Sequence, residues 1–163
     1  MPTRIKFTTK PRDFGKFHKR LAKEHARAFE AGEKAGARFV LQHLRMRTIA
    51  LRKVASGALL QGWRSERKRR GLVRFDNAAP HHVFVERGRL PGTLPPVGVI
   101  EAWALRKLGR PGLGWPIAVA IKRRGIKPAP IMNAPGFPSR ARQIMLRAMQ
   151  RAKEQATRKA ARS

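Results

Sequence analysis

The chain has 163 residues, the size of one ordinary domain, and 42% of them are hydrophobic, which predicts a folded core and argues against wholesale disorder. The chain has 38 Lys and Arg and nine Asp and Glu, which gives a net charge of +29. Such a charge predicts a negatively charged partner, with nucleic acid as the first candidate, an acidic protein ring as the second and an anionic membrane surface as the third. The absence of cysteine excludes disulfides, thiolate catalysis and Cys-ligated metal sites.

The N-terminal residues 1–11 are predicted to form an arm, in which Ile5 and Phe7 alternate with basic residues as in a short strand. No apolar segment follows these basic residues, so the sequence does not predict a secretory signal. No apolar run approaches the roughly 18 residues that cross a bilayer. We therefore expect no membrane partner and a protein that is made in a cytoplasm.

A long helix is predicted from residue 13 to residue 53, because this stretch lacks proline and is rich in good helix formers. Two tracks of seven-residue spacing predict one narrow apolar seam along it, formed by Phe14, Leu21, Ala28 and Ala35 and by Gly32, Phe39 and Met46. A glycine within a helix costs about 1 kcal/mol against alanine, so Gly32 and Gly36 indicate either tight packing or a bend. The helix is expected to end near Ser56-Gly57.

Two strands are predicted at residues 72–76 and 82–86, where β-branched and aromatic residues flank an Asn-Ala-Ala-Pro turn. Paired with one another, they would form a small antiparallel sheet. A basic turn precedes them, with the run Arg67, Lys68, Arg69 and Arg70. This run is either a phosphate contact or a solvated hairpin tip.

The carboxylates Asp76 and Glu86 end these two predicted strands, and carboxylates on neighbouring strands can hold Mg²⁺ against a phosphate, as nucleases do. The restriction-type nuclease pattern Asp…Glu-x-Lys is matched only in part, because Gly88 occupies the place of the lysine. Structural pairing with the many arginines is the favoured interpretation in a chain so poor in acids. We therefore expect no enzymatic activity, no catalytic residue, no metal and no cofactor.

Short helices are predicted at residues 97–108 and 115–124, and residues 126–138 form a proline-rich extended segment. Ser139 is the expected N-cap of a basic C-terminal helix at 139–163, whose outer face carries Arg147 and Arg151 as candidate contacts for DNA or an acidic partner. The predicted fold is α+β: long N-terminal and C-terminal helices pack on a small antiparallel sheet, with two short helices between them. No boundary is evident, so residues 1–163 are predicted to form a single domain.

An ordered series of motifs runs through the second half of the chain. It comprises Val85-Glu86-Arg87-Gly88, Pro91, the Trp103 helix, and Gly125-Ile126-Lys127-Pro128-Ala129-Pro130. In this order and spacing the residues resemble the tail-component family of tailed phages, the minor tail or tail-completion proteins of the head–tail neck. The chain departs from the family at the aromatic pair before Val-Glu, where it has His81, His82 and Phe84. It also departs after Pro-x-Pro, where Ile131-Met132 replaces the usual Phe.

The resemblance implies a structural virion protein of the head–tail connector, assembled in the host cytoplasm. It also implies a homo-oligomeric ring, of hexameric stoichiometry, that encloses the DNA channel and docks on other neck, portal-side and tail proteins. A positive channel would tolerate packaged double-stranded DNA through phosphate contacts alone, without reading bases. The alternative function is sequence-independent nucleic-acid binding of the ribosomal or nucleoid type.

Overall fold

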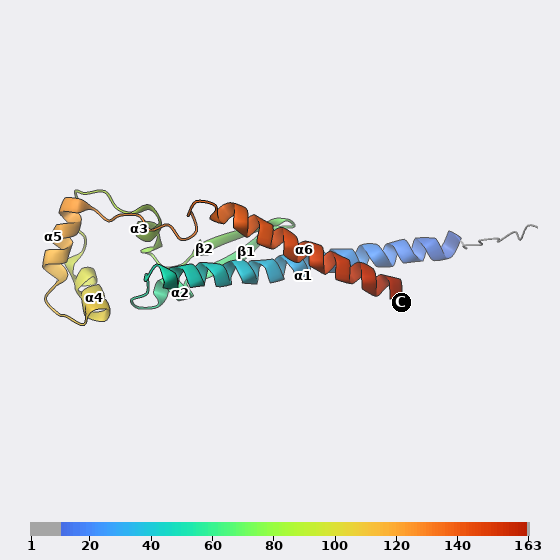
Figure 1. Cartoon of the computed structure of the whole chain (residues 1–163), viewed down its shortest axis with the longest axis horizontal. Coiled ribbons are helices and arrows are strands. Elements are labelled where there is room, and N and C mark those ends of the chain that lie inside the picture. Colours follow the sequence, from blue (N-terminus) through green and yellow to red (C-terminus); the bar gives the residue numbers. More distant parts are fainter. Residues whose placement is uncertain (1–10, 163) are drawn as a thin grey trace, which may run out of the picture. The chain divides into compact units, whose positions relative to one another are not determined.

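A computed structural model describes residues 11–162 of the chain (Figure 1). In chain order its elements are α1 (Pro11–Ala50), α2 (Ala58–Gln61), β1 (Trp63–Arg69), β2 (Leu72–Asn77), α3 (His82–Arg87), α4 (Val97–Leu108), α5 (Gly114–Arg124) and α6 (Phe137–Arg162). Long terminal helices, short helices and a small antiparallel sheet confirm the predicted α+β class. The predicted N-terminal arm lies outside the described residues, apart from Pro11, which begins α1.

The described residues divide into two compact units. The first unit contains residues 11–36 of α1 and residues 143–162 of α6. The second unit, Ala37–Arg142, contains the rest of both long helices, the sheet and the short helices. The single domain over residues 1–163 stays a prediction.

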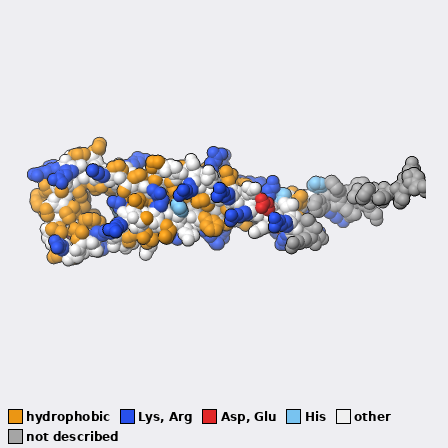
Figure 2. All heavy atoms as spheres, viewed as in Figure 1, with side chains coloured by type: hydrophobic (Ala, Val, Ile, Leu, Met, Phe, Trp, Pro, Cys, Tyr) orange, Lys and Arg blue, Asp and Glu red, His pale blue; other side chains and the backbone are white. Residues whose placement is uncertain are grey.

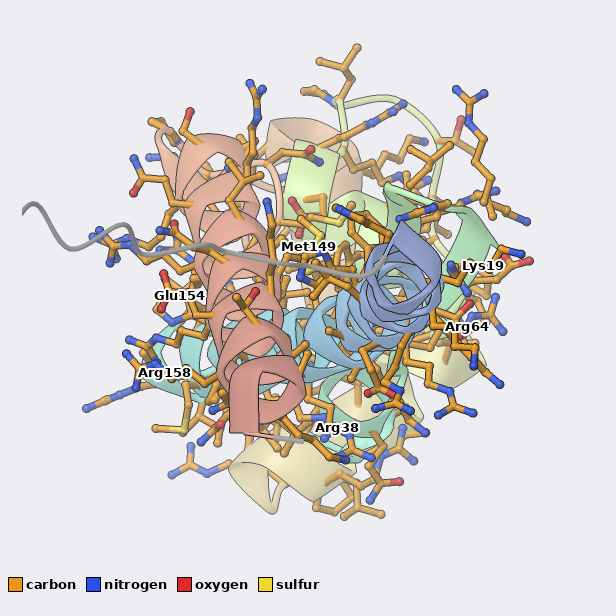
Figure 3. All side chains as sticks on the ribbon, turned by 90° about the vertical axis from the view of Figure 1, so that its right-hand side faces the viewer. Lys19, Arg38, Arg64, Met149, Glu154 and Arg158 are labelled. Carbon is orange, nitrogen blue, oxygen red and sulfur yellow. The ribbon has the colours of Figure 1, made fainter. Side chains whose placement is uncertain are left out.

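In the first unit, small residues let α1 and α6 approach closely. Gly32 and Gly36 are both buried, and a Cβ atom on Gly32 would lie 2.7 Å from the Cα atom of Met149. Figure 3 shows Met149 on the side of α6 that faces α1, whereas Glu154 and Arg158 lie on its outer side. The two glycines therefore serve tight helix packing, which is one of the alternatives that the sequence left open.

Replacing Gly32 with alanine is expected to destabilise this helix pair by about 1–3 kcal/mol, because the new methyl group meets backbone that has no room to retreat. Gly15 lies on the same helix in open space, so Gly15→Ala serves as the matched control. The control should be neutral or gain up to about 1 kcal/mol from its better helix propensity. Urea denaturation followed by circular dichroism measures both variants, and equal stabilisation by the two substitutions would contradict the close packing.

In the second unit, the buried face of α1 recurs every three or four residues and consists of Ala37, Val40, Leu44 and Thr48. The buried Trp63 donates its indole N–H to the Thr48 hydroxyl (2.9 Å), which in turn donates to the Leu44 carbonyl (2.8 Å). The predicted seam is wrong in this part, since Phe39 and Met46 are 56% and 59% exposed. The seven-residue spacing predicted Phe39 and Met46, which are one and two residues away from the buried positions of α1. The hydrogen bond from Trp63 to Thr48 fixes which face of α1 is buried.

The sheet is a hairpin in which β1 and β2 pair in antiparallel fashion. The predicted strand at 72–76 is confirmed as β2, but its partner is the basic segment 63–69 and not 82–86. The strand predicted at 82–86 is wrong, because these residues form the helix α3. β-Branched and aromatic residues favour a strand only where a neighbouring strand pairs with their backbone. Among the described residues β2 pairs with β1 alone, so residues 82–86 have no strand partner.

The helices predicted in the second half lie close to where the sequence placed them. The bounds of α4 are the predicted ones, and α5 begins one residue early, at Gly114. However, α6 begins at Phe137, so the prediction of Ser139 as its N-cap is wrong. Pro138 fits the first turn of a helix, where no N–H partner is needed, and Phe137 is buried with its ring stacked 5.8 Å from that of His43.

The C-terminal end of α1 comes at Ala50, earlier than the predicted end near Ser56-Gly57. Arg52 has a φ of 52°, a left-handed conformation that stops the helix. The ammonium group of Lys107, on α4, donates hydrogen bonds to the carbonyls of Arg52 (3.1 Å) and Val54 (2.7 Å). A cation at the end of α1 suits the negative pole of the helix and ties α4 to it.

Candidate functional site

The residues that carry the family resemblance meet at one place in the second unit, which we call the motif junction (residues 82–91 and 125–133). The backbone N–H of Ala129 donates to the carbonyl of Val85 at 2.8 Å. Arg89 and Ile126 exchange two backbone hydrogen bonds, of 2.9 and 2.8 Å, in an isolated antiparallel bridge. Two segments almost forty residues apart in sequence are thus joined through their main chains.

The Glu86 carboxylate is the centre of this junction. Glu86 is 7% exposed, and one of its oxygens accepts the backbone N–H groups of Ile131 (3.0 Å) and Met132 (2.8 Å). The other oxygen accepts the backbone N–H (3.1 Å) and the side-chain amide (3.3 Å) of Asn133. Burying a carboxylate is costly unless hydrogen bonds replace its water, and these four donors do so.

Two glycines allow the segments of the junction to approach. Gly88 has a φ of 73° and Gly125 a φ of 71°, which are left-handed conformations that favour glycine. A Cβ atom on Gly88 would collide with the carbonyl of Ile126, and one on Gly125 would collide with the carbonyl of Arg89. Both positions therefore require glycine for the backbone conformation and for the bridge.

The prolines of the motif also belong to the junction, whereas Trp103 does not. Pro91 lies against Gly125, and Pro128 lies against Gly88. The carbonyl of Pro130 accepts a hydrogen bond of 3.4 Å from Arg47, on α1. Trp103 is a partly exposed residue of α4.

Removing the Glu86 side chain should leave buried backbone N–H groups without an acceptor. We expect Glu86→Ala to lower the free energy of unfolding by about 3 kcal/mol or more, and Glu86→Gln by less, because the amide keeps one acceptor oxygen. The control is Glu66→Gln on β1, which disturbs an exposed pair with Lys68 and should change stability by less than about 1 kcal/mol. Urea denaturation measures all three variants. Equal losses at positions 86 and 66 would contradict the role of Glu86.

The basic hairpin β1–β2 separates its charges by face. Arg64 lies opposite Asp76 in the strand register and donates to both carboxylate oxygens, at 2.6 and 3.4 Å. Glu66, on the same strand face as Arg64, accepts a bond of 2.6 Å from Lys68 and lies opposite Arg74. Both acids of the hairpin therefore lie on one strand face and are paired with cations there. The exposed run Arg67–Arg70 covers the end of β1 and the first residue of the turn, and within it Lys68 is the partner of Glu66.

The hydrogen bond from Arg64 holds the pKa of Asp76 below its usual value, helped by the charges of Arg64, Arg74 and His82 against the opposing effect of burial. A carboxyl group whose pKa is lower in the folded state than in the unfolded state stabilises the folded state at pH values above its unfolded-state pKa. That contribution disappears as the pH falls through the folded-state value.

We therefore expect Asp76→Asn to be less stable than the parent at pH 7, with the difference closing as the pH falls below the ordinary Asp value of 3.8. Urea midpoints measured across the pH range check this. In the Arg64→Gln background the difference should shrink at every pH, since the partner that lowers the pKa is gone. A difference that is independent of pH would show that the carboxylate charge is immaterial.

The paired-carboxylate geometry considered for Asp76 and Glu86 is not present. Asp76 is on β2, Glu86 is on α3, and each carboxylate is engaged by other groups of the protein. The expected pairing with arginine is confirmed for Asp76 and wrong for Glu86, whose partners are N–H donors. Among the described residues, no group of three or more His, Cys, Asp or Glu is placed to hold a metal ion.

A second carboxylate with a structural role escaped the sequence reasoning. Glu101, on α4, accepts the backbone N–H groups of Gly112 and Gly114 in the turn before α5. Gly114 is buried, and a Cβ atom there would lie 2.8 Å from the Cβ atom of Glu101. The available signal was an acid in a short helix, followed by a turn with three glycines.

The other predicted contact residues lie in the first unit. Arg147 and Arg151 are exposed and one helical turn apart on α6, so their side chains share a face of that helix. Residues 143–163 contain six Lys and Arg against one acid, Glu154, which accepts a hydrogen bond from Gln150. This geometry permits phosphate or carboxylate contacts, while the run Arg67–Arg70 belongs to the second unit.

Comparison with known proteins adds no relative: no family model, no curated protein and no solved structure matches the chain. Among residues 11–162, no helix is both long and apolar enough to cross a membrane.

Proposed function

We propose that the protein is a structural component of the head–tail junction of a tailed double-stranded-DNA phage. In this proposal it assembles as a homo-oligomeric ring, of six copies as the family resemblance implies, around the DNA channel. Other neck, portal-side and tail proteins are its neighbours. The proposal assigns the chain no reaction, no metal and no cofactor.

The observation that carries the proposal is the motif junction. Apart from Trp103, the residues that carry the resemblance fall in two groups that are distant in sequence, around Val85-Glu86 and around Gly125-Ile126. In the fold these groups bond to one another through Glu86, the Arg89–Ile126 bridge and Val85. Residues that form one physical unit are expected to occur together, which supports treating the ordered motifs as one signature rather than as separate chance matches.

The charge distribution supports a role beside DNA. The second unit has 22 Lys and Arg and four acids. Two of these acids, Glu86 and Glu101, are bound to backbone N–H groups and not to cations. Phosphate contacts by the remaining basic surface would be independent of base sequence and would weaken steeply with salt. Such contacts suit a channel through which DNA of any sequence passes.

Sequence-independent nucleic-acid binding by the free protein is the second candidate. The observation that favours it is the exposed basic run Arg67–Arg70, at the end of β1 and the start of the turn, because Lys and Arg contacts to phosphate supply sequence-independent binding. The two functions differ in what the purified protein does alone. A neck protein closes into a ring or waits for its neighbours, whereas a free binder grips duplex DNA or RNA as a monomer or dimer.

Native mass spectrometry of the purified full-length protein, with and without short duplex DNA across a salt series, separates these functions. The proposal predicts a closed ring whose affinity for DNA is weak and equal for duplexes of unrelated sequence. A stable monomer or dimer that binds DNA tightly would overturn the proposal in favour of the second candidate. In that case the logarithm of the affinity should fall by about 0.9 per neutralised phosphate for each unit of log salt.

A further inference from the structure

The hairpin of α4 and α5 exposes large apolar side chains that its own fold leaves uncovered. These are Val99, Trp103, Leu105 and Leu108 on α4 and Trp115 on α5, which together we call the hairpin surface. Trp115 is 60% exposed and Trp103 is 39% exposed. On the face seen in Figure 2, hydrophobic side chains gather over this part of the second unit. Exposed tryptophans are unusual in a surface that meets only water and are typical of protein interfaces.

The charges beside the hairpin surface are all positive where they face solvent. The exposed cations of the hairpin are Arg106, Lys107, Arg110, Lys122, Arg123 and Arg124. Its one acid, Glu101, already accepts two backbone N–H groups in the turn. The surface thus combines apolar side chains with a basic rim that the hairpin's own carboxylate does not offset. The complementary surface is apolar at its centre and carries carboxylates at its edge.

Two other occupants fit less well. A second copy docked through the same surface would bring Arg106, Arg110 and their neighbours against the same cations, at a high electrostatic cost. A flat lipid surface touches one side of a helix. On α4, however, Trp103 and Leu105 are two residues apart, which is about 200° around the helix axis, so the apolar side chains lie on opposite sides. A partner that contacts both sides of α4 must have a concave surface, which a protein can provide.

We propose that the hairpin surface is a docking site for an acidic protein partner, with Trp103 and Trp115 as its apolar anchors. The partner places apolar side chains against the two tryptophans and carboxylates against the surrounding Lys and Arg. This docking does not depend on ring formation or on DNA. It adds a partner class, defined by charge and apolarity, to a surface distinct from the basic hairpin β1–β2.

The test uses the full-length protein and two synthetic helical peptides of equal negative charge. One peptide has Glu on one face and Leu on the other, and in the second every Leu is replaced by Gln. The protein should bind the Leu-containing peptide about tenfold more tightly, and the double variant Trp103→Ala, Trp115→Ala should lose this preference while still binding both peptides through charge. Leu72→Ala, at an exposed apolar residue of β2 outside the α4–α5 hairpin, is the matched control and should keep the preference.

Intrinsic fluorescence adds a readout that a folding defect would not mimic. Trp63 is buried, so a blue shift on peptide binding must come from the two exposed tryptophans, and Trp63 emission reports that the variants remain folded. Equal affinity for both peptides, or a preference that survives in the double variant, would overturn the proposal. So would a double variant that loses only self-association or only binding to phosphatidylglycerol vesicles. A stable monomer or dimer that binds DNA tightly and keeps the peptide preference would refute the neck function and leave this docking site standing.

Discussion

The Glu86 carboxylate, buried and held by backbone N–H groups of residues 131–133, fixes the architecture of the second unit. It positions α3 against the segment that leads into α6, and the Arg89–Ile126 bridge follows directly after it. That bridge joins the chain before α4 to the chain after α5. The segment that contains both helices therefore begins and ends at the motif junction. Glu101 then closes the far turn of the same hairpin in the same way, with a carboxylate that accepts two N–H groups. The position of the hairpin surface depends on both contacts.

This use of carboxylates has an electrostatic consequence. Of the nine acids in the chain, Glu86 and Glu101 bind backbone N–H groups. Asp76 and Glu66 pair with Arg64 and Lys68 on one face of the β1–β2 hairpin. The four acids of the second unit therefore make contacts within its fold, and its remaining exposed Lys and Arg have no further acids in that unit to pair with. A strongly basic surface attracts negative groups, and the proposed function draws on this through phosphates and acidic proteins.

Much of the helical structure follows from local sequence, because helix propensity and stop signals act over a few residues. The bounds of α4 and the glycine packing at Gly32 are of this kind. The strand predicted at 82–86 failed because its Val and Phe residues lack a strand partner, and the structure uses them in a short helix that aims Glu86 at a distant segment. The motif residues could be picked out by resemblance, but their common hydrogen bonds could not. A carboxylate that binds N–H groups 45 residues away leaves no local periodicity.

Backbone amide hydrogen exchange, measured by NMR on the full-length protein, tests most directly whether the motif junction is held by Glu86. The amides of Ile131, Met132 and Asn133 should exchange as slowly as those around Leu44 in the core. In Glu86→Gln their protection should fall more than that of the core amides. Exchange of these three amides at the rate of an exposed loop in the parent protein would contradict the account, because the carboxylate could then not be holding the junction together.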